Sequence, residues 1–256
     1  MRHTTTWISG RGALLAVVVM LLAPLAAVVS TAGPAQAGPA FEEPAVGECR
    51  ALTFDEALRK SNNEAPIDCS QAHTSRVIAT GRLPRGVSWS APMRQLKRIF
   101  TRTCDPAWKA ALGRTYRSRA MTAYTWAWFM PTKAQRAQGA RWIRCDLILL
   151  GGRKLDPLPT DAQPALGAQP HPSRIAACLG PASLRDTACT NRHAFRATGT
   201  FVIHQKAHPT ARQIERAAHR KCPSRVSSRV FLWFDHGPVR WQLGDHVVIC
   251  YSRTRR

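Results

Sequence analysis

The sequence predicts an α+β protein: a tandem repeat of two small disulfide-stapled units, each one helix on a short antiparallel sheet, after an N-terminal signal peptide. Three observations lead to this prediction. They are an even number of cysteines, an ungapped internal repeat, and apolar runs of both helical and alternating period in each repeat. The chain has 256 residues, 45% of them hydrophobic, which excludes a small disulfide knot and a fully disordered chain.

Residues 1–37 have the features of a secretory signal peptide. Arg2 and Arg11 flank a polar start, Ala13–Val29 is apolar, and an Ala-x-Ala cleavage site ends at Ala37. An uncleaved membrane anchor is the alternative, because the apolar run is slightly short for a bilayer span. No later run is long enough to span a membrane. We therefore expect an extracytoplasmic protein, either secreted or anchored to the outer face of the cytoplasmic membrane.

The charge balance predicts an anionic partner. The chain has 37 Lys and Arg against 15 Asp and Glu, a formal net charge of +22. Residues 1–37 contain two Arg and no acid, so the rest of the chain keeps a net charge of +20. Arginine supplies most of this charge, and its planar guanidinium suits bidentate contact with phosphate, sulfate and carboxylate groups.

Three blocks of the sequence occur twice, in the same order and without gaps. Arg94 to Cys104 matches Arg212 to Cys222, Cys69-x-x-x-His73 matches Cys189-x-x-x-His193, and Trp128 to Cys145 matches Trp233 to Cys250. Three such blocks indicate a duplication. The first unit is predicted over 46–150 and the second over 174–253. The proline-rich stretch 155–173 between them is predicted to be an extended linker.

Each unit is expected to contain one principal helix and three strands. Residues 92–104 place Met93, Leu96 and Phe100 on one helical face, and residues 209–222 repeat this pattern behind a proline near the first turn. Short apolar or alternating runs predict the strands. These runs are 75–80, 124–129, 141–150, 195–203, 230–234 and 246–251.

All eight cysteines follow the signal segment. An even number in an exported chain predicts four disulfides, because thiols are oxidised outside the cytoplasm. Four cysteines in each unit allow three connectivities, of which we expect first-to-second and third-to-fourth. The third-to-fourth pair would fasten the helix end to the last strand. The predicted bridges are Cys49–Cys69, Cys104–Cys145, Cys178–Cys189 and Cys222–Cys250.

Rows of arginine on the two predicted helices are the candidate binding site. Arg94, Arg98 and Arg102 lie one turn apart, opposite the apolar face, and Arg212, Arg216 and Arg220 reproduce the row. Like charges at this spacing repel, so nothing local favours such a row. An anionic wall polymer or membrane surface would explain it, and an envelope protein is the other partner considered. A solvated face in an Arg-rich chain is the alternative. Nucleic acid is a poor candidate for an exported chain with three Tyr.

Catalysis is not expected. No P-loop, HExxH motif or nucleophile elbow occurs, and no acidic residue repeats between the units. Oxidised cysteines can act neither as zinc ligands nor as nucleophiles. We therefore predict no catalytic residue, no metal and no cofactor. The alternative is an envelope hydrolase that uses first-unit carboxylates, with Asp105 and Asp146 as the residues to replace.

Two repeated features have both a structural and a functional interpretation. His73 and His193 each follow a predicted disulfide, where the ring could hydrogen-bond the turn into the next strand or contact a ligand. The Trp-Phe pairs 128–129 and 233–234 could belong to the core or stack on a glycan. We favour the structural interpretation for both.

The first unit resembles the septum-formation domain of exported actinobacterial proteins. The resemblance rests on Val46-Gly47-x-Cys49, Cys69-x-x-x-His73, Cys104 and Gly139-x-Arg141-Trp142-x-x-Cys145. The second unit is a weaker match, because Ala176 replaces Gly47 and Val247 replaces Trp142. The resemblance implies an envelope location, a link to cell division and no established enzymatic activity.

Overall fold

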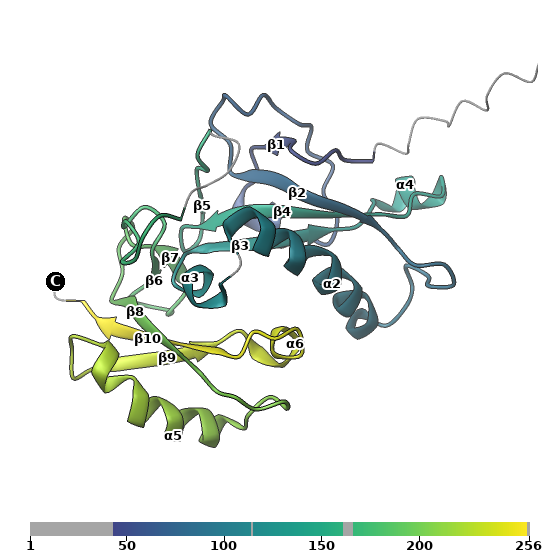
Figure 1. Cartoon of the computed structure of the whole chain (residues 1–256). Coiled ribbons are helices and arrows are strands. Elements are labelled where there is room, and N and C mark those ends of the chain that lie inside the picture. The colour runs from purple at the N-terminus through teal and green to yellow at the C-terminus, as the bar shows by residue number, and fades with distance from the viewer. Residues whose placement is uncertain (1–42, 114, 161–165, 255–256) are drawn as a thin grey trace, which may run out of the picture. The chain divides into compact units, whose positions relative to one another are not determined.

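The computed structural model describes residues 43–113, 115–160 and 166–254 (Figure 1). The predicted signal segment 1–37 lies outside the described residues. The described residues all belong to one compact unit. No helix in the described part of the chain has the length and apolarity needed to cross a membrane.

The first sheet is antiparallel and mixed with helices, as predicted, and has five strands in place of the expected three. Its order is β1-β2-β4-β3, and β5 pairs with β4. The strands are β1 (Cys49–Arg50), β2 (Ser75–Arg82), β3 (Tyr124–Phe129), β4 (Trp142–Leu150) and β5 (Leu155–Asp156). The helices are α1 (Phe54–Ala57), α2 (Met93–Leu112), α3 (Tyr116–Ala120) and α4 (Lys133–Ala137).

The second sheet also has five antiparallel strands, in the order β7-β6-β8-β10-β9. They are β6 (Ala177–Leu179), β7 (Asp186–Ala188), β8 (Phe195–Val202), β9 (Phe231–Asp235) and β10 (Val247–Arg253). The helices are α5 (Ala211–Lys221), the 3-10 turn Pro223–Arg225 and α6 (Gly237–Trp241). Helix α5 covers one face of this sheet, and α3 lies against the other (Figure 1).

The three central strands have the same arrangement in both sheets. β2, β4 and β3 of the first sheet correspond to β8, β10 and β9 of the second, with β4 and β10 in the middle. Each sheet has a bulge where Ile78 or Thr198 has no partner beside Cys145 or Cys250. A bulge is a specific local feature, so its recurrence at matching sequence positions supports the equivalence of the two sheets.

Helix α2 runs eight residues beyond the predicted end at Cys104 and passes through Pro106. The apolar face continues at four-residue spacing through Trp108 and Leu112, both of which are buried. They pack with Tyr124, Leu147 and other buried residues of the first sheet. Burial of this longer face is large enough to offset the cost of proline inside a helix.

The described parts of the stretch 155–173, residues 155–160 and 166–173, differ from the extended linker that was predicted. Leu155–Asp156 forms strand β5, and Leu158 and Leu166 are buried in a cluster with Ile175 and Trp108. The proline content of the stretch predicted an extended chain. Its buried leucines, Leu158 and Leu166, instead pack it against the rest of the protein.

The four disulfides are those predicted. They join Cys49 to Cys69, Cys104 to Cys145, Cys178 to Cys189 and Cys222 to Cys250, and the described residues include no free cysteine. Two of the bridges fasten α2 to β4 and the end of α5 to β10. Disulfides form and persist in oxidising compartments, so the bridges indicate an extracytoplasmic environment.

Candidate functional site

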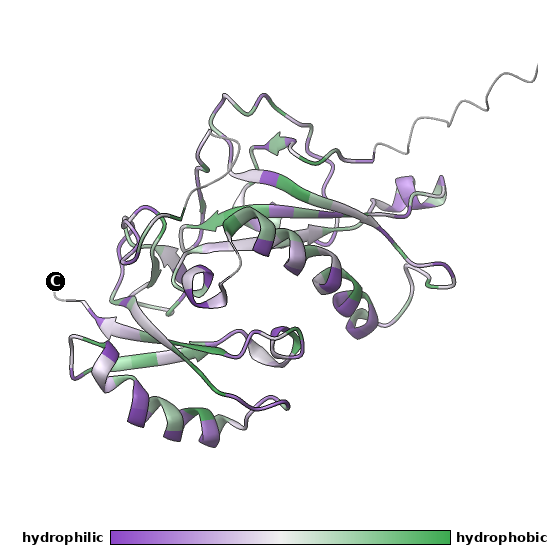
Figure 2. Ribbon diagram, in the orientation of Figure 1, coloured by the Kyte–Doolittle hydropathy of each residue, from purple (hydrophilic) through white to green (hydrophobic). Residues whose placement is uncertain are grey.

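Helix α2 presents the first of the two predicted arginine rows to solvent. Leu96 and Phe100 are buried against the first sheet, in a cluster that includes Cys104 and Ile143. Arg94, Arg98 and Arg102 lie on the opposite side, and all three are exposed. Figure 2 shows the hydrophilic and hydrophobic bands that alternate along this helix.

Helix α5 presents the second row in the same way. Thr210 caps the helix, because its Oγ1 accepts a hydrogen bond from the Gln213 N–H while the Gln213 Oε1 accepts one from the Thr210 N–H at 2.8 Å. Ile214, Ala217 and Ala218 face the sheet. The exposed residues opposite them are Arg212, Arg216 and Arg220.

The six arginines of these rows carry charge that no described acid neutralises. Within the described ranges, none of the six forms an ion pair or a side-chain hydrogen bond. Three guanidinium groups one helical turn apart repel each other by a few tenths of a kcal/mol per pair. Each row is therefore a preformed line of hydrogen-bond donors. Binding of an anionic partner would reduce the repulsion between the guanidinium groups.

His73 and His193 hold the turns that lead into β2 and β8. The Nδ1 of His73 lies 2.9 Å from the Gln71 carbonyl oxygen, and the Nδ1 of His193 lies 2.7 Å from the Asn191 carbonyl oxygen. Each Nδ1 therefore donates its proton to a carbonyl two residues earlier. This geometry is the turn-stabilising role favoured from the sequence. The two rings differ in access, because His73 is 1% exposed and His193 is half-buried.

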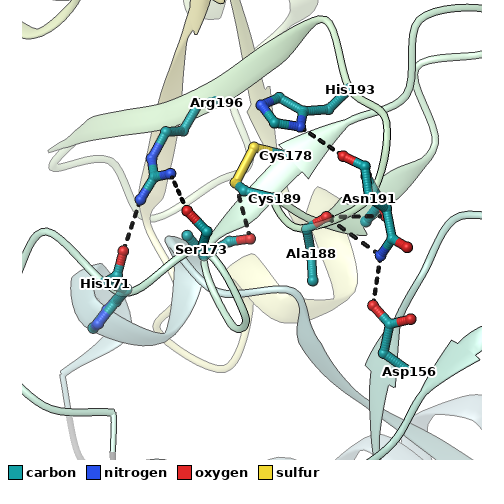
Figure 3. The surroundings of a disulfide bond; sticks show 11 residues. Asp156, His171, Ser173, Cys178, Ala188, Cys189, Asn191, His193 and Arg196 are labelled. Atoms are coloured by element: carbon teal, nitrogen blue, oxygen red, sulfur yellow. Dashed lines mark hydrogen bonds between the residues drawn. A yellow bond between two sulfur atoms is a disulfide. The ribbon is translucent and has the colours of Figure 1, made fainter.

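Metal binding has one candidate cluster among the described residues, formed by Cys178, Cys189 and His193. Figure 3 shows the His193 ring beside the disulfide that joins these two cysteines. Disulfide sulfurs are not thiolates, so only the histidine could act as a ligand. A single histidine does not make a zinc site.

The carboxylates of the hydrolase alternative lie in buried networks. Asp146 is fully buried, with Ser75 Oγ at 2.5 Å and Arg144 Nε at 2.9 Å. Burial raises the pKa of the Asp146 carboxyl, and the nearby Arg144 charge opposes that rise. Asp105 is bound by Lys109 Nζ at 2.7 Å and by the Tyr116 hydroxyl at 3.2 Å. The linings of five cavities in the described part of the chain include neither carboxylate.

The repeated Trp-Phe pairs are mainly packing residues. Trp128 stacks on Phe100 with ring centroids 4.0 Å apart, and Trp233 packs in the cluster under α5. Phe129 is fully buried. Phe234 differs from the predicted core position, because it is 42% exposed. It lies on β9, the terminal strand of the second sheet, where few neighbours cover it.

A basic groove of about 1410 Å³ was not predicted from the sequence. Its lining combines arginine, histidine and hydroxyl side chains and includes no carboxylate. The basic side chains of the lining are His193, Arg196, Arg229 and Arg253. Helical periodicity cannot locate such a groove, since its residues come from strand ends and a loop. The usable signal was the polar pair Ser252 and Thr254, at positions where the first unit has leucine.

The septum-formation family matches residues 87–250, well over half of the chain. The chain belongs to this family. One continuous match extends from the segment before α2 to Cys250 in β10, so it covers parts of both sheets. The motifs around Cys49 and Cys69 lie before the matched range. No curated protein and no solved structure matches the chain.

Proposed function

We propose that this septum-formation protein is a non-catalytic, exported component of the cell envelope. In this proposal the arginine rows of α2 and α5 bind an anionic wall polymer, a lipid surface or an envelope protein. One observation carries the proposal: six exposed arginines stand in two rows at one-turn spacing without acidic partners among the described residues. Each arginine near an anionic surface contributes about 1 kcal/mol to binding.

Export and duplication are parts of the same proposal. The four disulfides and the signal-like segment 1–37 support secretion or anchoring at the outer face of the membrane. The ungapped sequence blocks, the common strand arrangement and the bulges at Ile78 and Thr198 support a tandem duplication. Duplication would explain why the arginine row occurs twice.

The family description favours a second candidate, a protein-interaction module of the division machinery whose charge is incidental. Salt separates this candidate from the first. Exposed charges are screened over about 8 Å at physiological ionic strength, so polymer binding should weaken steeply as salt is added. Binding to a protein partner through a packed interface should persist at salt concentrations that abolish polymer binding.

The deciding experiment is co-sedimentation of the purified exported protein with isolated cell walls and with anionic liposomes, across a salt series. We expect R94Q/R98Q/R102Q to weaken binding by about a hundredfold at low salt, from about 1 kcal/mol per arginine. R212Q/R216Q/R220Q tests the second row in the same way. The matched control R59Q/R85Q/R153Q removes three exposed arginines elsewhere and should have a much smaller effect. Equal weakening by the row and control variants, or no sedimentation of the wild type, would overturn the proposal.

A further inference from the structure

The basic groove lies where β8 begins and β10 ends, beyond the end of α5. Val248 and Cys250 of β10 pack against α5, and Ser252 follows on the same face by strand alternation. Helix α5 ends at Lys221, before the last part of β10, where the Ser227 N–H donates to Ser252 Oγ at 3.1 Å and the Ser252 side chain is buried. The groove lining comprises Pro181, His193, Ala194, Phe195, Arg196, Thr198, Ser227, Ser228, Arg229, Ser252, Arg253 and Thr254.

The corresponding surface of the first sheet is covered by a helix and belongs to the hydrophobic core. There, α2 has 20 residues against 11 in α5, and its extra turns bring Trp108 and Leu112 over the sheet. These side chains cluster with Leu147 and Leu149, and Ile78 packs against them.

The residues at the corresponding places of the second sheet are polar. Thr198 stands at the bulge position of Ile78, and Ser252 and Thr254 stand at the positions of Leu147 and Leu149. The second sheet therefore lacks both the extra helical turns of α2 and the apolar side chains that these turns cover in the first sheet. Ser252 is 2% exposed and bonds to Ser227, whereas Thr198 is exposed and Thr254 is half-buried. The hydroxyls of Thr198 and Thr254 are therefore the ones open to water or to a polar ligand.

Arginine side chains give the groove its charge. Arg229 and Arg253 are exposed, and neither forms an ion pair with a described residue. Arg196 is held by the His171 carbonyl oxygen at 2.7 Å and by Ser173 Oγ at 3.0 Å, as Figure 3 shows. Its guanidinium is fixed in place, so it contributes charge to the groove.

Further polar groups are available for a ligand. The His193 Nδ1 is engaged by Asn191, which leaves Nε2 without a partner among the described residues. Ser228 Oγ accepts the Val230 N–H at 3.1 Å and keeps its own proton free to donate. Two free arginines and several hydroxyls offer more donors than the two oxygens of a carboxylate can accept. A phosphate group has more acceptor oxygens and is bound bidentately by arginine.

We propose that this groove binds a phosphate group carried on a hydroxyl-bearing chain, such as the phosphodiester of a polyol polymer. The proposal rests on the proposed function and names the ligand chemistry that would give it specificity. The arginine rows supply charge along the helices, and the groove recognises one phosphate unit. Arg229 and Arg253 contact the phosphate oxygens, while hydroxyl side chains contact the adjoining polyol.

The test is calorimetric titration of the purified exported protein with a short glycerol phosphate oligomer at 150 mM salt. We expect R229Q/R253Q to weaken affinity by about tenfold or more. The control R85Q/R153Q removes the same charge from exposed positions outside the groove lining and should change affinity by less than about twofold. Thr198→Trp blocks the groove without changing charge, and it should weaken affinity as strongly as R229Q/R253Q. Circular dichroism and thermal melting check that each variant is folded.

Two comparisons identify the source and the chemistry of the anion. A polygalacturonate oligomer of equal charge should bind at least tenfold more weakly than the glycerol phosphate oligomer, because it offers only carboxylates. Phosphatidylglycerol vesicles should bind through the arginine rows. R229Q/R253Q and its control R85Q/R153Q should therefore have equal affinity for these vesicles. A groove dependence seen only with vesicles, equal binding of the two oligomers, or equal affinity for R229Q/R253Q and R85Q/R153Q would overturn the groove proposal.

The outcomes also separate this proposal from the proposed function. Wild-type protein that binds neither walls, vesicles nor oligomers overturns both. Wild-type protein that binds walls, loses binding in R94Q/R98Q/R102Q and keeps full affinity in R229Q/R253Q and Thr198→Trp supports the arginine rows and overturns the groove.

Discussion

Asp146 is the buried charge on which the centre of the first sheet depends. It pairs with Arg144, whose guanidinium also lies 4.2 Å from the Phe129 ring centroid and donates to Asn62 Oδ1 at 3.1 Å. Asp146→Asn would leave the Arg144 charge buried without its counter-ion. We expect the free energy of unfolding to fall by about 3–5 kcal/mol, measured by urea unfolding followed by tryptophan fluorescence.

An apolar replacement of the pair is the control for that prediction. Replacing Arg144 by Met together with Asp146 by Leu removes both charges and keeps much of the side-chain volume. This double variant should recover most of the stability lost in Asp146→Asn. If Asp146→Asn unfolds at the wild-type urea concentration, the buried ion pair contributes nothing and the interpretation is wrong.

Residue roles were predictable from the sequence where spacing alone decides them. The exposure of Arg94, Arg98 and Arg102 follows from their distance around the helix from Leu96 and Phe100. The burial of Arg119, which is 0% exposed and stacks over Trp108 and Tyr116, could not be predicted. A charged side chain can be buried against aromatic faces, but no sequence period shows which faces it will meet.

Secondary structure elements followed the sequence pattern closely at their centres and less closely at their ends. The predicted strand 124–129 is β3 without change, and the predicted helix 209–222 contains α5. The short strands β1, β5, β6 and β7 were not predicted, because two or three residues give too few positions for an alternating pattern. The α2 extension was missed since Pro106 resembles a helix end.

The four disulfides should stabilise the fold in the order of the loops they close. The loops closed are 41 residues for Cys104–Cys145, 28 for Cys222–Cys250, 20 for Cys49–Cys69 and only 11 for Cys178–Cys189. From loop-closure entropy alone, loss of the first should cost about 4 kcal/mol and loss of the last about 3 kcal/mol. Paired Cys→Ala variants compared by denaturant unfolding check this order. A C178A/C189A variant less stable than C104A/C145A would contradict it.

The contacts between the two sheets' helices and loops make the described chain one unit, which the sequence did not indicate. The Ala123 N–H donates to the Ile175 carbonyl oxygen at 2.8 Å, and the Tyr116 hydroxyl donates to the Leu243 carbonyl oxygen at 3.0 Å. Sequence repeats predict two similar units but contain no information on the surface by which they join. The proline-rich stretch therefore indicated separation where the structure has a shared core.

Arg240 of α6 is the side chain through which this joining is best tested. Its guanidinium carbon lies 4.6 Å from the Trp108 ring centroid and 5.2 Å from that of Trp126, so a cation of the second sheet's α6 packs on two aromatic rings of the first half. Burial lowers the pKa of Arg240, although arginine remains charged at neutral pH. Arg240→Ala removes both cation–π contacts, and we expect it to lower the free energy of unfolding by about 2–4 kcal/mol.

Differential scanning calorimetry tests both the loss of stability in Arg240→Ala and whether the two halves unfold together. The wild-type protein should unfold in a single transition whose calorimetric and van't Hoff enthalpies agree, because each half buries residues of the other. In Arg240→Ala the whole transition should move to lower temperature, and Arg240→Lys, which keeps the charge but loses the planar group, should lie between the two. Two separate transitions in the wild type, or an Arg240→Ala change confined to part of the unfolding enthalpy, would show instead that the halves fold independently and that the contact at Trp108 is not a joint between them.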